Sequence, residues 1–281
     1  MKTNPPTSNK NFPARLHILL ARDAKVGLVI RRGPAKSVCT ILWNRDRDTF
    51  KLGQWLRGRI YERRCDLSPD AKHLIYFAMN GRWHSETKGS WTAISIVPYL
   101  KAISLFAKGD CWHGGGFFLT NREFWINDGH GHIQLKAAKA LRQNVTWHPP
   151  ENFGGECLTI YYNRLQRDDW VMSKEKYQGA DLFEKQLPKS WKLRKLAFAE
   201  STIGAPPGQG CYWDAHELRH EVTNTILVYP EWQWADYVDG RLIFAVDGQL
   251  RTAQLGSGKL SDEKLLQDFN DMKFQAIAAP Y

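Results

Sequence analysis

The sharpest chemical motif in this sequence has the form H-E-x-x-H and occupies residues 216–220. On a helix, His216 and His220 would lie on one face and could bind zinc, with Glu217 as the general base of a hydrolase. The flanking residues favour another structure, because glycines precede the motif and a β-type run follows it at 223–228. We therefore expect a strand end and a turn without metal, where substitutions change stability by less than about 0.5 kcal/mol. A zinc-dependent hydrolase using these three residues is the alternative.

Three tryptophans are followed directly by a histidine, which is more often than the composition predicts. Such pairs could stack on a ligand and hydrogen-bond to it if the fold brought them to one end. We favour the simpler interpretation that the tryptophans pack between sheets while the histidines bond to backbone. The residues of this possible ligand cluster are Trp83, His84, Trp112, His113, Trp147 and His148.

The other catalytic patterns in the sequence are incomplete. The stretch His113-Gly114-Gly115-Gly116 is similar to the oxyanion loop of α/β-hydrolases, but no G-x-S-x-G nucleophile elbow accompanies it. The same glycines lack the Lys-Ser/Thr that completes a phosphate-binding loop. We accordingly predict no catalytic residue and no cofactor.

The whole chain has a net charge of +10, and the positive charge is concentrated in its first quarter. Residues 1–64 contain 15 Lys and Arg against 4 Asp and Glu, and the remaining residues contain 24 against 25. Arginine suits bidentate contacts with carboxylates and phosphates, so we expect an acidic protein partner to dock here. Nucleic acid is the less favoured partner, since no recognised nucleic-acid module is visible. The predicted partner-binding residues are Arg31, Arg32, Arg45, Arg47, Arg57, Arg59, Arg63 and Arg64.

The segments that must position these residues are short and extended in character. Runs rich in β-branched and aromatic residues recur about every 8–12 residues with turn residues between them, which predicts an all-β fold. We expect a strong strand at 157–162 and one short C-terminal helix at 261–269, with Ser261 as its N-cap. A last short strand at 274–279 could pair with an N-terminal strand and close a ring.

Two stretches of similar sequence, 66–78 and 236–245, each run from an aspartate through a turn and a basic residue into Leu-Ile-(Tyr)-Phe-Ala. The Ser-Pro-Asp turn before the first of these strands resembles the WD40-like β-propellers of the PD40 or TolB type. The chain also resembles uncharacterised bacterial propeller proteins of similar length. These resemblances imply a propeller of about six blades, with five or seven as alternatives. Cys65, Cys111 and Cys157 follow one another at a spacing consistent with such a blade.

The remaining expectations concern the chain as a whole. Residues 1–13 are polar and are predicted to form a flexible tail, and residues 14–281 a single propeller domain. No apolar run is long enough to span a membrane, and the five cysteines contain no C-x-x-C pair. We therefore expect a cytoplasmic protein with reduced thiols. The prediction is a non-enzymatic β-propeller that acts as a protein–protein interaction module, neutralising or scaffolding a bacterial partner.

Overall fold

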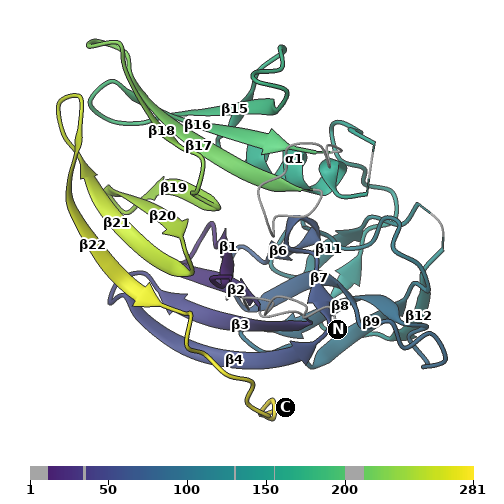
Figure 1. The fold of residues 1–281 in the computed structure, drawn as a ribbon. Helices are drawn as coiled ribbons and strands as arrows, with labels where there is room; N and C mark the ends of the chain where they lie inside the picture. The colour runs from purple at the N-terminus through teal and green to yellow at the C-terminus, as the bar shows by residue number, and fades with distance from the viewer. Residues whose placement is uncertain (1–11, 34–35, 130, 155, 200–211) are drawn as a thin grey trace, which may run out of the picture.

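The structure is a computed structural model that describes residues 12–33, 36–129, 131–154, 156–199 and 212–281. Strands account for 49% of the described residues and helices for 5%, which confirms the all-β prediction. The described strands form five sheets, numbered here by the first strand of each, around a common centre in a propeller-like arrangement (Figure 1). Five sheets among the described residues correspond to the lowest of the three blade numbers considered, and not to the favoured number of about six. The predicted tail lies, except for Phe12 and Pro13, outside the described residues, and the single-domain boundary stays a prediction.

Sheets 1 and 5 are four-stranded antiparallel meanders at the two ends of the chain. Each strand follows the last through a short polar turn, so their order in the sheet equals their order in sequence. Sheet 1 contains β1 (Arg15–Leu20), β2 (Val26–Arg32), β3 (Ser37–Asn44) and β4 (Thr49–Arg57). Sheet 5 contains β19 (Trp234–Val238), β20 (Arg241–Val246), β21 (Gln249–Leu255) and β22 (Leu260–Asp268).

Sheets 2 and 3 are less regular. Sheet 2 is antiparallel, while β13 of sheet 3 pairs with β11 in parallel. Sheet 2 contains β5 (Arg59–Ile60), β6 (Asp66–Leu67), β7 (His73–Met79), β8 (Ser90–Ile96), β9 (Ala102–Ala107) and β12 (Ile133–Lys136). Sheet 3 contains β10 (Gly116–Phe118), β11 (Glu123–Ile126) and β13 (Arg142–Gln143).

Sheet 4 is a five-stranded antiparallel sheet that follows the α-helix in the chain. The helices are the 3-10 turn η1 (Glu62–Arg64) and α1 (Leu158–Arg167), and no helix in the described segments is long and apolar enough to cross a membrane. Sheet 4 contains β14 (Val171–Met172), β15 (Asp181–Gln186), β16 (Trp191–Phe198), β17 (Trp213–His220) and β18 (Thr225–Tyr229).

The strand predicted at 157–162 and the helix predicted at 261–269 were both wrong. The first segment is helical because Leu158, Tyr161, Tyr162 and Leu165 repeat at helical spacing, and all four lie in the core beside sheet 4. The second segment is strand β22, because it pairs along its length with β21 at the edge of sheet 5. Cross-strand pairing there overrides the helix-favouring local composition.

The ring does not close through a strand at 274–279, since no strand is assigned there. Sheets 1 and 5 instead pack through a shared hydrophobic cluster that includes Trp43, Ile243 and Phe269. Arg31 on β2 also donates hydrogen bonds to the carbonyls of Phe269 and Asn270, at 3.0 Å each. The contact between sheets 1 and 5, which we call the seam, is therefore made by side chains and not by strand pairing.

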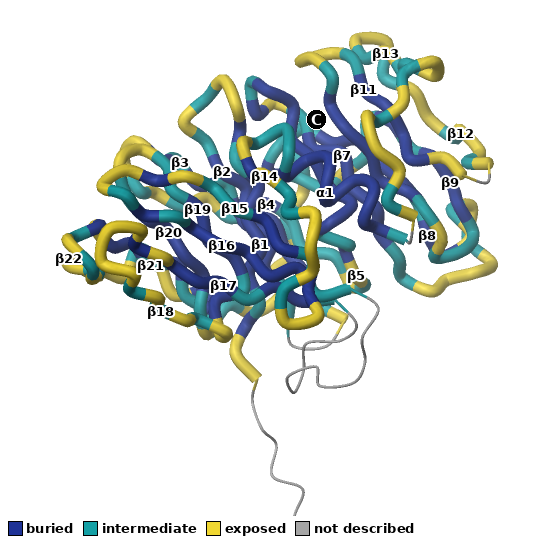
Figure 2. The backbone as a smooth tube through the Cα atoms, turned by 90° about the horizontal axis from the view of Figure 1, so that it is seen from above, coloured by how far each residue is buried: buried dark blue, intermediate teal, exposed yellow. Residues whose placement is uncertain are grey.

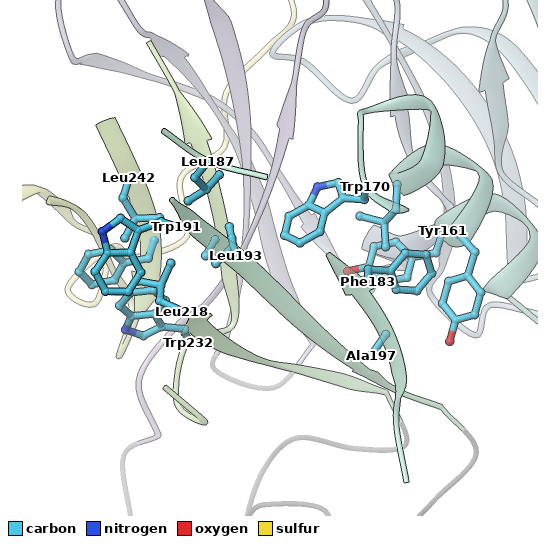
Figure 3. Packing of buried hydrophobic residues seen from close by; sticks show 14 of the residues in the cluster. Tyr161, Trp170, Phe183, Leu187, Trp191, Leu193, Ala197, Leu218, Trp232 and Leu242 are labelled. Atoms are coloured by element: carbon cyan, nitrogen blue, oxygen red, sulfur yellow. The ribbon is translucent and has the colours of Figure 1, made fainter. Parts of the chain in front are cut away.

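Burial follows this architecture: the central strands are buried and the loops at the sheet ends are exposed (Figure 2). The largest cluster joins α1, sheet 4 and sheet 5 (Figure 3). In it, Trp232 stacks on Phe244 with 4.1 Å between ring centroids, and Tyr162 meets Phe183 edge-on at 4.8 Å. Aromatic packing of this kind fixes the distance between neighbouring sheets.

The two related stretches form equivalent hairpins. Asp66 lies opposite Ile75 in the β6–β7 pair, and Asp236 lies opposite Ile243 in the β19–β20 pair. In the first hairpin Ala71 adopts the left-handed conformation, with φ of 59°, at the position where glycine is usual. The sequence repeat is thus a structural repeat with the aspartates in matching positions.

Candidate functional site

A cavity of about 480 Å³ lies where β1, α1, β16 and β19 come together near the centre of the ring. We call it the axial pocket. It reaches solvent past Arg22, Asp169 and Asp239, which are exposed. Its wall is unusually rich in charge for an interior position, and its polar residues include His17, Asp66, Arg164, Arg167, Lys195 and Asp236.

The two repeat aspartates both line the axial pocket, and each is held by a cation from another element. Asp66 accepts a two-pronged contact from Arg167 of α1, at 2.8 and 3.0 Å. Asp236 accepts from the Lys185 ammonium of β15 at 2.8 and 3.1 Å. The repeated residue therefore joins its own sheet to a neighbouring element across the centre of the molecule.

A third carboxylate, Asp214 of β17, is buried next to the pocket residue Tyr161. It accepts hydrogen bonds from Arg63 at 2.7 Å and from the Tyr161 hydroxyl at 2.5 Å. Burial acts to raise the pKa of Asp214, but the charge of Arg63 and then that of Lys195 outweigh it and lower that pKa to about 2. Asp214 is thus ionised at neutral pH and ties η1, α1 and sheet 4 together.

Two buried imidazoles accept hydrogen bonds from buried cations. Arg164 donates to Nε2 of His17 at 3.0 Å, and Lys195 donates to Nε2 of His216 at 3.0 Å. Nδ1 of His216 lies 2.8 Å from the Trp232 carbonyl, so it carries the proton and leaves Nε2 as the acceptor. Burial, followed by the charge of the adjacent cation, lowers the pKa of each histidine to about 3. Both rings are therefore neutral at physiological pH.

Lys195 is the most unusual group in the pocket wall. Its side chain is 1% exposed, and its Nζ lies 4.9 Å from the centre of the Trp170 ring. Within the part of the chain that is described, no carboxylate lies within ion-pair distance of this amine. Burial lowers the pKa of Lys195 to about 8.

The H-E-x-x-H residues lie on strand β17, so the strand expectation is confirmed and the helical context of the zinc-hydrolase alternative is wrong. Two residues four apart on a strand are about 13 Å apart, which is too far for one metal ion. His216 faces Lys195, Glu217 pairs with Arg194 at 2.5 Å, and His220 bonds to Thr223 at 2.8 Å. His216 and Glu217 are buried, so the premise that they occupy turn or surface positions is wrong, and we now expect substitutions there to destabilise the fold.

The possible ligand cluster is only partly assembled. His113 and His148 line one surface cavity of about 610 Å³ together with Trp125. Trp147 instead packs against Trp125, with 5.6 Å between ring centroids. The other members, Trp83, His84 and Trp112, are exposed and do not line that cavity. A ligand role for the six residues stays a prediction.

Four of the predicted partner-binding arginines are buried structural cations, which corrects their assignment as partner contacts. Arg31 makes the seam described above, and Arg45 pairs with Asp239 of the sheet 5 turn at 3.3 Å. Arg63 pairs with Asp214, and Arg64 pairs with Glu156 at 2.6 Å. These side chains cannot meet a partner's surface, because neighbouring elements already enclose them.

The other four predicted arginines lie at opposite ends of sheet 1. Arg47 is in the β3–β4 turn, a mixed-charge segment with Asp46 and Asp48. Arg32, Arg57 and Arg59 lie at the other end, where β2 and β4 finish and β5 begins. Arg15 lies at that end as well, directly opposite Arg32 in the β1–β2 pair. Lys36 also lies there, because its carbonyl accepts from the Gly58 amide. We call this set the basic rim: Arg15, Arg32, Lys36, Arg57 and Arg59.

One acid, Glu62, lies within the basic rim and pairs with Arg32 at 3.3 Å. Burial acts to raise the pKa of Glu62, but Arg32 and then Arg59 outweigh it and lower that pKa to about 2. Among the described residues, one carboxylate is thus assigned to the end of sheet 1 that carries these five cations, whereas the far end of sheet 1 has its charges in pairs such as Lys25–Asp46 and Arg241–Asp48. The positive charge of the first quarter is therefore focused at one end of the sheet.

Sequence reasoning missed the axial residues Tyr161, Lys195 and Asp214. A usable signal existed for the pocket as a whole, because the two related hairpins repeat an aspartate at the same strand position. No such signal exists for Lys195, whose distinction arises from partners on other strands.

Comparisons with known proteins leave the family open. No family model and no curated protein matches the chain. A hydrazine synthase structure from Kuenenia stuttgartiensis matches with 6% identity and a TM-score of 0.30, over 90% of this chain and 80% of that one. Similarity at this level carries no argument, so the architecture rests on the sheets described above. Membership of the WD40-like propellers stays a prediction.

Proposed function

We propose that this chain is a propeller-like protein-interaction module that docks an acidic surface of its partner at the basic rim. The observation that supports this most directly is the charge of the rim, where Arg15, Arg32 and Arg59 act on Glu62 and Arg57 and Lys36 lie at the same end of the sheet. Arg57 and Arg59 are exposed, and their guanidinium groups are held over the Phe274 and Tyr61 rings at 4.7 and 4.5 Å. Such support presents the charge in a fixed place without neutralising it.

The rim suits a protein surface better than a nucleic acid. A carboxylate-bearing patch on a partner needs a few fixed guanidinium groups, whereas nucleic-acid binding generally needs a longer basic track with a recognised module. The scaffolding or neutralising role and the cytoplasmic location belong to the same proposal. Docking of this kind requires neither a catalytic residue nor a cofactor.

The test is charge reversal at the rim with a matched control at the far end of sheet 1. Wild type, the double variant Arg57→Glu/Arg59→Glu and the control Arg47→Glu are used as bait in the native host, and captured partners are identified by mass spectrometry. The partner's association rate is then measured at low and high salt. We expect the double variant to slow association at least about tenfold at low salt, with a smaller difference at high salt, because charge steering acts on association and is screened.

Arg47→Glu should leave the association rate nearly unchanged. Equal slowing by both variants, or none by the double variant, contradicts docking at the rim. Capture of RNA or DNA in place of a protein, lost in the double variant, would replace the acidic protein partner with nucleic acid.

A further inference from the structure

Two lysines lie beside one tryptophan ring in the axial pocket, and they differ in burial and in hydrogen-bond partner. Lys185 of β15 lies 5.0 Å from the centre of the Trp170 ring, and Lys195 of β16 lies 4.9 Å from it. Lys185 donates to both oxygens of Asp236. Lys195 donates to the neutral imidazole of His216. The molecule therefore contains its own comparison between a paired amine and one without a carboxylate partner.

Burial without a carboxylate partner makes Lys195 the amine to consider for chemistry. A carboxylate at ion-pair distance keeps an ammonium protonated, whereas an imidazole that only accepts a hydrogen bond is satisfied by either the ammonium or the free amine. Burial is the main cause that lowers the pKa of Lys195 to about 8. Asp214 and Asp236 act to raise it, and Arg63 and Lys185 act to lower it. About a tenth of Lys195 is then free amine at pH 7, against less than about a thousandth of an ordinary lysine.

The pocket has room and charge for a small ligand beside this amine. Its volume of about 480 Å³ falls in the range of small-molecule sites. Arg164, buried in the same wall, has no carboxylate at ion-pair distance among the described residues and donates to neutral His17. Its charge and that of Lys195 both act on His17, so the two cations share one region of the pocket. Arg164 also donates to the carbonyls of Glu62 and Cys65. The wall contains aspartates, but those described above pair with other cations, so an anionic group of a ligand is the complement that Lys195 and Arg164 lack.

We propose that the axial pocket binds a small oxo acid and that Lys195 holds the carbonyl carbon of this ligand as an imine. The lone pair of Nζ adds to the carbonyl carbon, and the amine proton passes to the carbonyl oxygen to give a carbinolamine. Loss of that oxygen as water forms the C=N bond, so one amine and one carbonyl give one imine and one water. The step needs no oxidant or reductant. The carboxylate of the ligand is attracted by the positive charge of Arg164.

The experiment traps the imine in the full-length wild-type protein. The protein is incubated with pyruvate and sodium cyanoborohydride, whose hydride reduces the imine to a stable secondary amine, and peptide mass spectrometry locates the added mass. We expect Lys195 to be labelled on the order of a hundredfold faster than Lys185. The rate at Lys195 should rise from pH 6 to 9 with a midpoint near its pKa of about 8. Labelling spread evenly over the lysines would overturn the proposal.

Two further arms sharpen the result. Propanal has the carbonyl without the carboxylate, so equal labelling by propanal and pyruvate would overturn the oxo-acid part. Lys195→Arg keeps the charge but cannot form an imine, and it should lose the label, whereas Lys185→Arg should keep it. If Lys195→Arg does not fold, the ratio of label at Lys195 to label at Lys185 in the wild type still tests the proposal, because an equal ratio would overturn it. The rim variants of the previous section leave this readout unchanged, so the two proposals fail independently.

Discussion

At the scale of single residues, the centre of this molecule is held by ionised and neutral polar groups in a fixed pattern. Asp66, Asp214 and Asp236 are each bound by a cation from another element. His17 and His216 stay neutral because burial opposes their protonation. Loss of one partner of such a buried pair strongly destabilises the fold. We therefore expect protonation of these central groups to be a main cause of unfolding in acid.

The stability of the fold should therefore depend on pH through these histidines. In the unfolded chain each imidazole takes up a proton near pH 6.5, whereas in the fold the pKa of each is about 3. Their contribution is thus complete above pH 6.5 and is lost as pH falls towards 3. Each should lower the free energy of unfolding by about 1.4 kcal/mol per pH unit between about pH 6 and 4. Urea unfolding at several pH values measures this slope.

His216→Gln retains an acceptor for Lys195 without titrating, so its slope should be smaller by about 1.4 kcal/mol per pH unit. The exposed His84→Gln is the control and should keep the wild-type slope. Identical slopes in wild type and His216→Gln would show that His216 does not titrate on unfolding.

At the scale of elements, Cys65, Cys111 and Cys157 lie before elements that pack together. They precede β6, β10 and α1, and β10 contacts both β6 and α1. Arg64 links two of these places by donating to the Cys111 carbonyl at 2.7 Å and pairing with Glu156. Cys111 and Cys157 lie where the chain leaves one sheet for the next element, whereas Cys65 lies between two strands of sheet 2, so the regular spacing does not mark equivalent points of successive sheets.

The glycines at the start of β10 are required because the chain packs closely against η1 there. Gly115 has a φ of 76°, and a Cβ atom there would lie 1.9 Å from the Arg64 carbonyl oxygen. Gly115→Ala should cost more than about 3 kcal/mol, combining backbone strain with a clash. Gly81 has a similar φ of 72°, but a Cβ atom there would meet no other atom within 4 Å, so Gly81→Ala should cost only about 1–2 kcal/mol. Equal losses in urea unfolding would remove the steric explanation.

At the scale of the whole molecule, residues 273–281 run across the sheets, and we call this segment the strap. Phe274 packs on Trp55 of sheet 1, and Gln54 donates to the Ile277 carbonyl at 2.7 Å. The Tyr281 hydroxyl accepts from the Ile96 amide at 3.1 Å and donates to the Lys101 carbonyl at 2.8 Å. The strap therefore connects sheet 5 to sheet 2 across the outside of sheet 1.

Removal of residues 273–281 should lower the free energy of unfolding by about 2–3 kcal/mol, because it uncovers Trp55 and breaks these hydrogen bonds. Urea denaturation of the truncated and full chains measures the difference. Leu265→Ala, at an exposed position on β22, is the control and should change it by less than about 0.5 kcal/mol. A truncated chain as stable as the full one would show that the strap contributes nothing.

The sequence by itself determined the strand-rich fold, the two hairpins and the place of the excess charge. These follow from local signals: β-branched runs, turn residues, and the count of arginines along the chain. The same local signals misled where burial or pairing with a distant segment decided the outcome, as at α1 and β22. There the free energy of tertiary contacts exceeds the small differences in local propensity.

Only the tertiary structure decided which charged side chains are exposed to a partner and which are buried. Arg31 and Arg57 are indistinguishable in sequence, yet one is enclosed by the end of β22 and the other is exposed. Likewise, Lys185 and Lys195 lie on adjacent strands, yet Lys185 pairs with Asp236 whereas Lys195 is fully buried and donates to His216, and burial lowers the pKa of Lys195. The energy of a charge depends on its solvation and its nearest counter-charges, and both are set by residues far away in the chain.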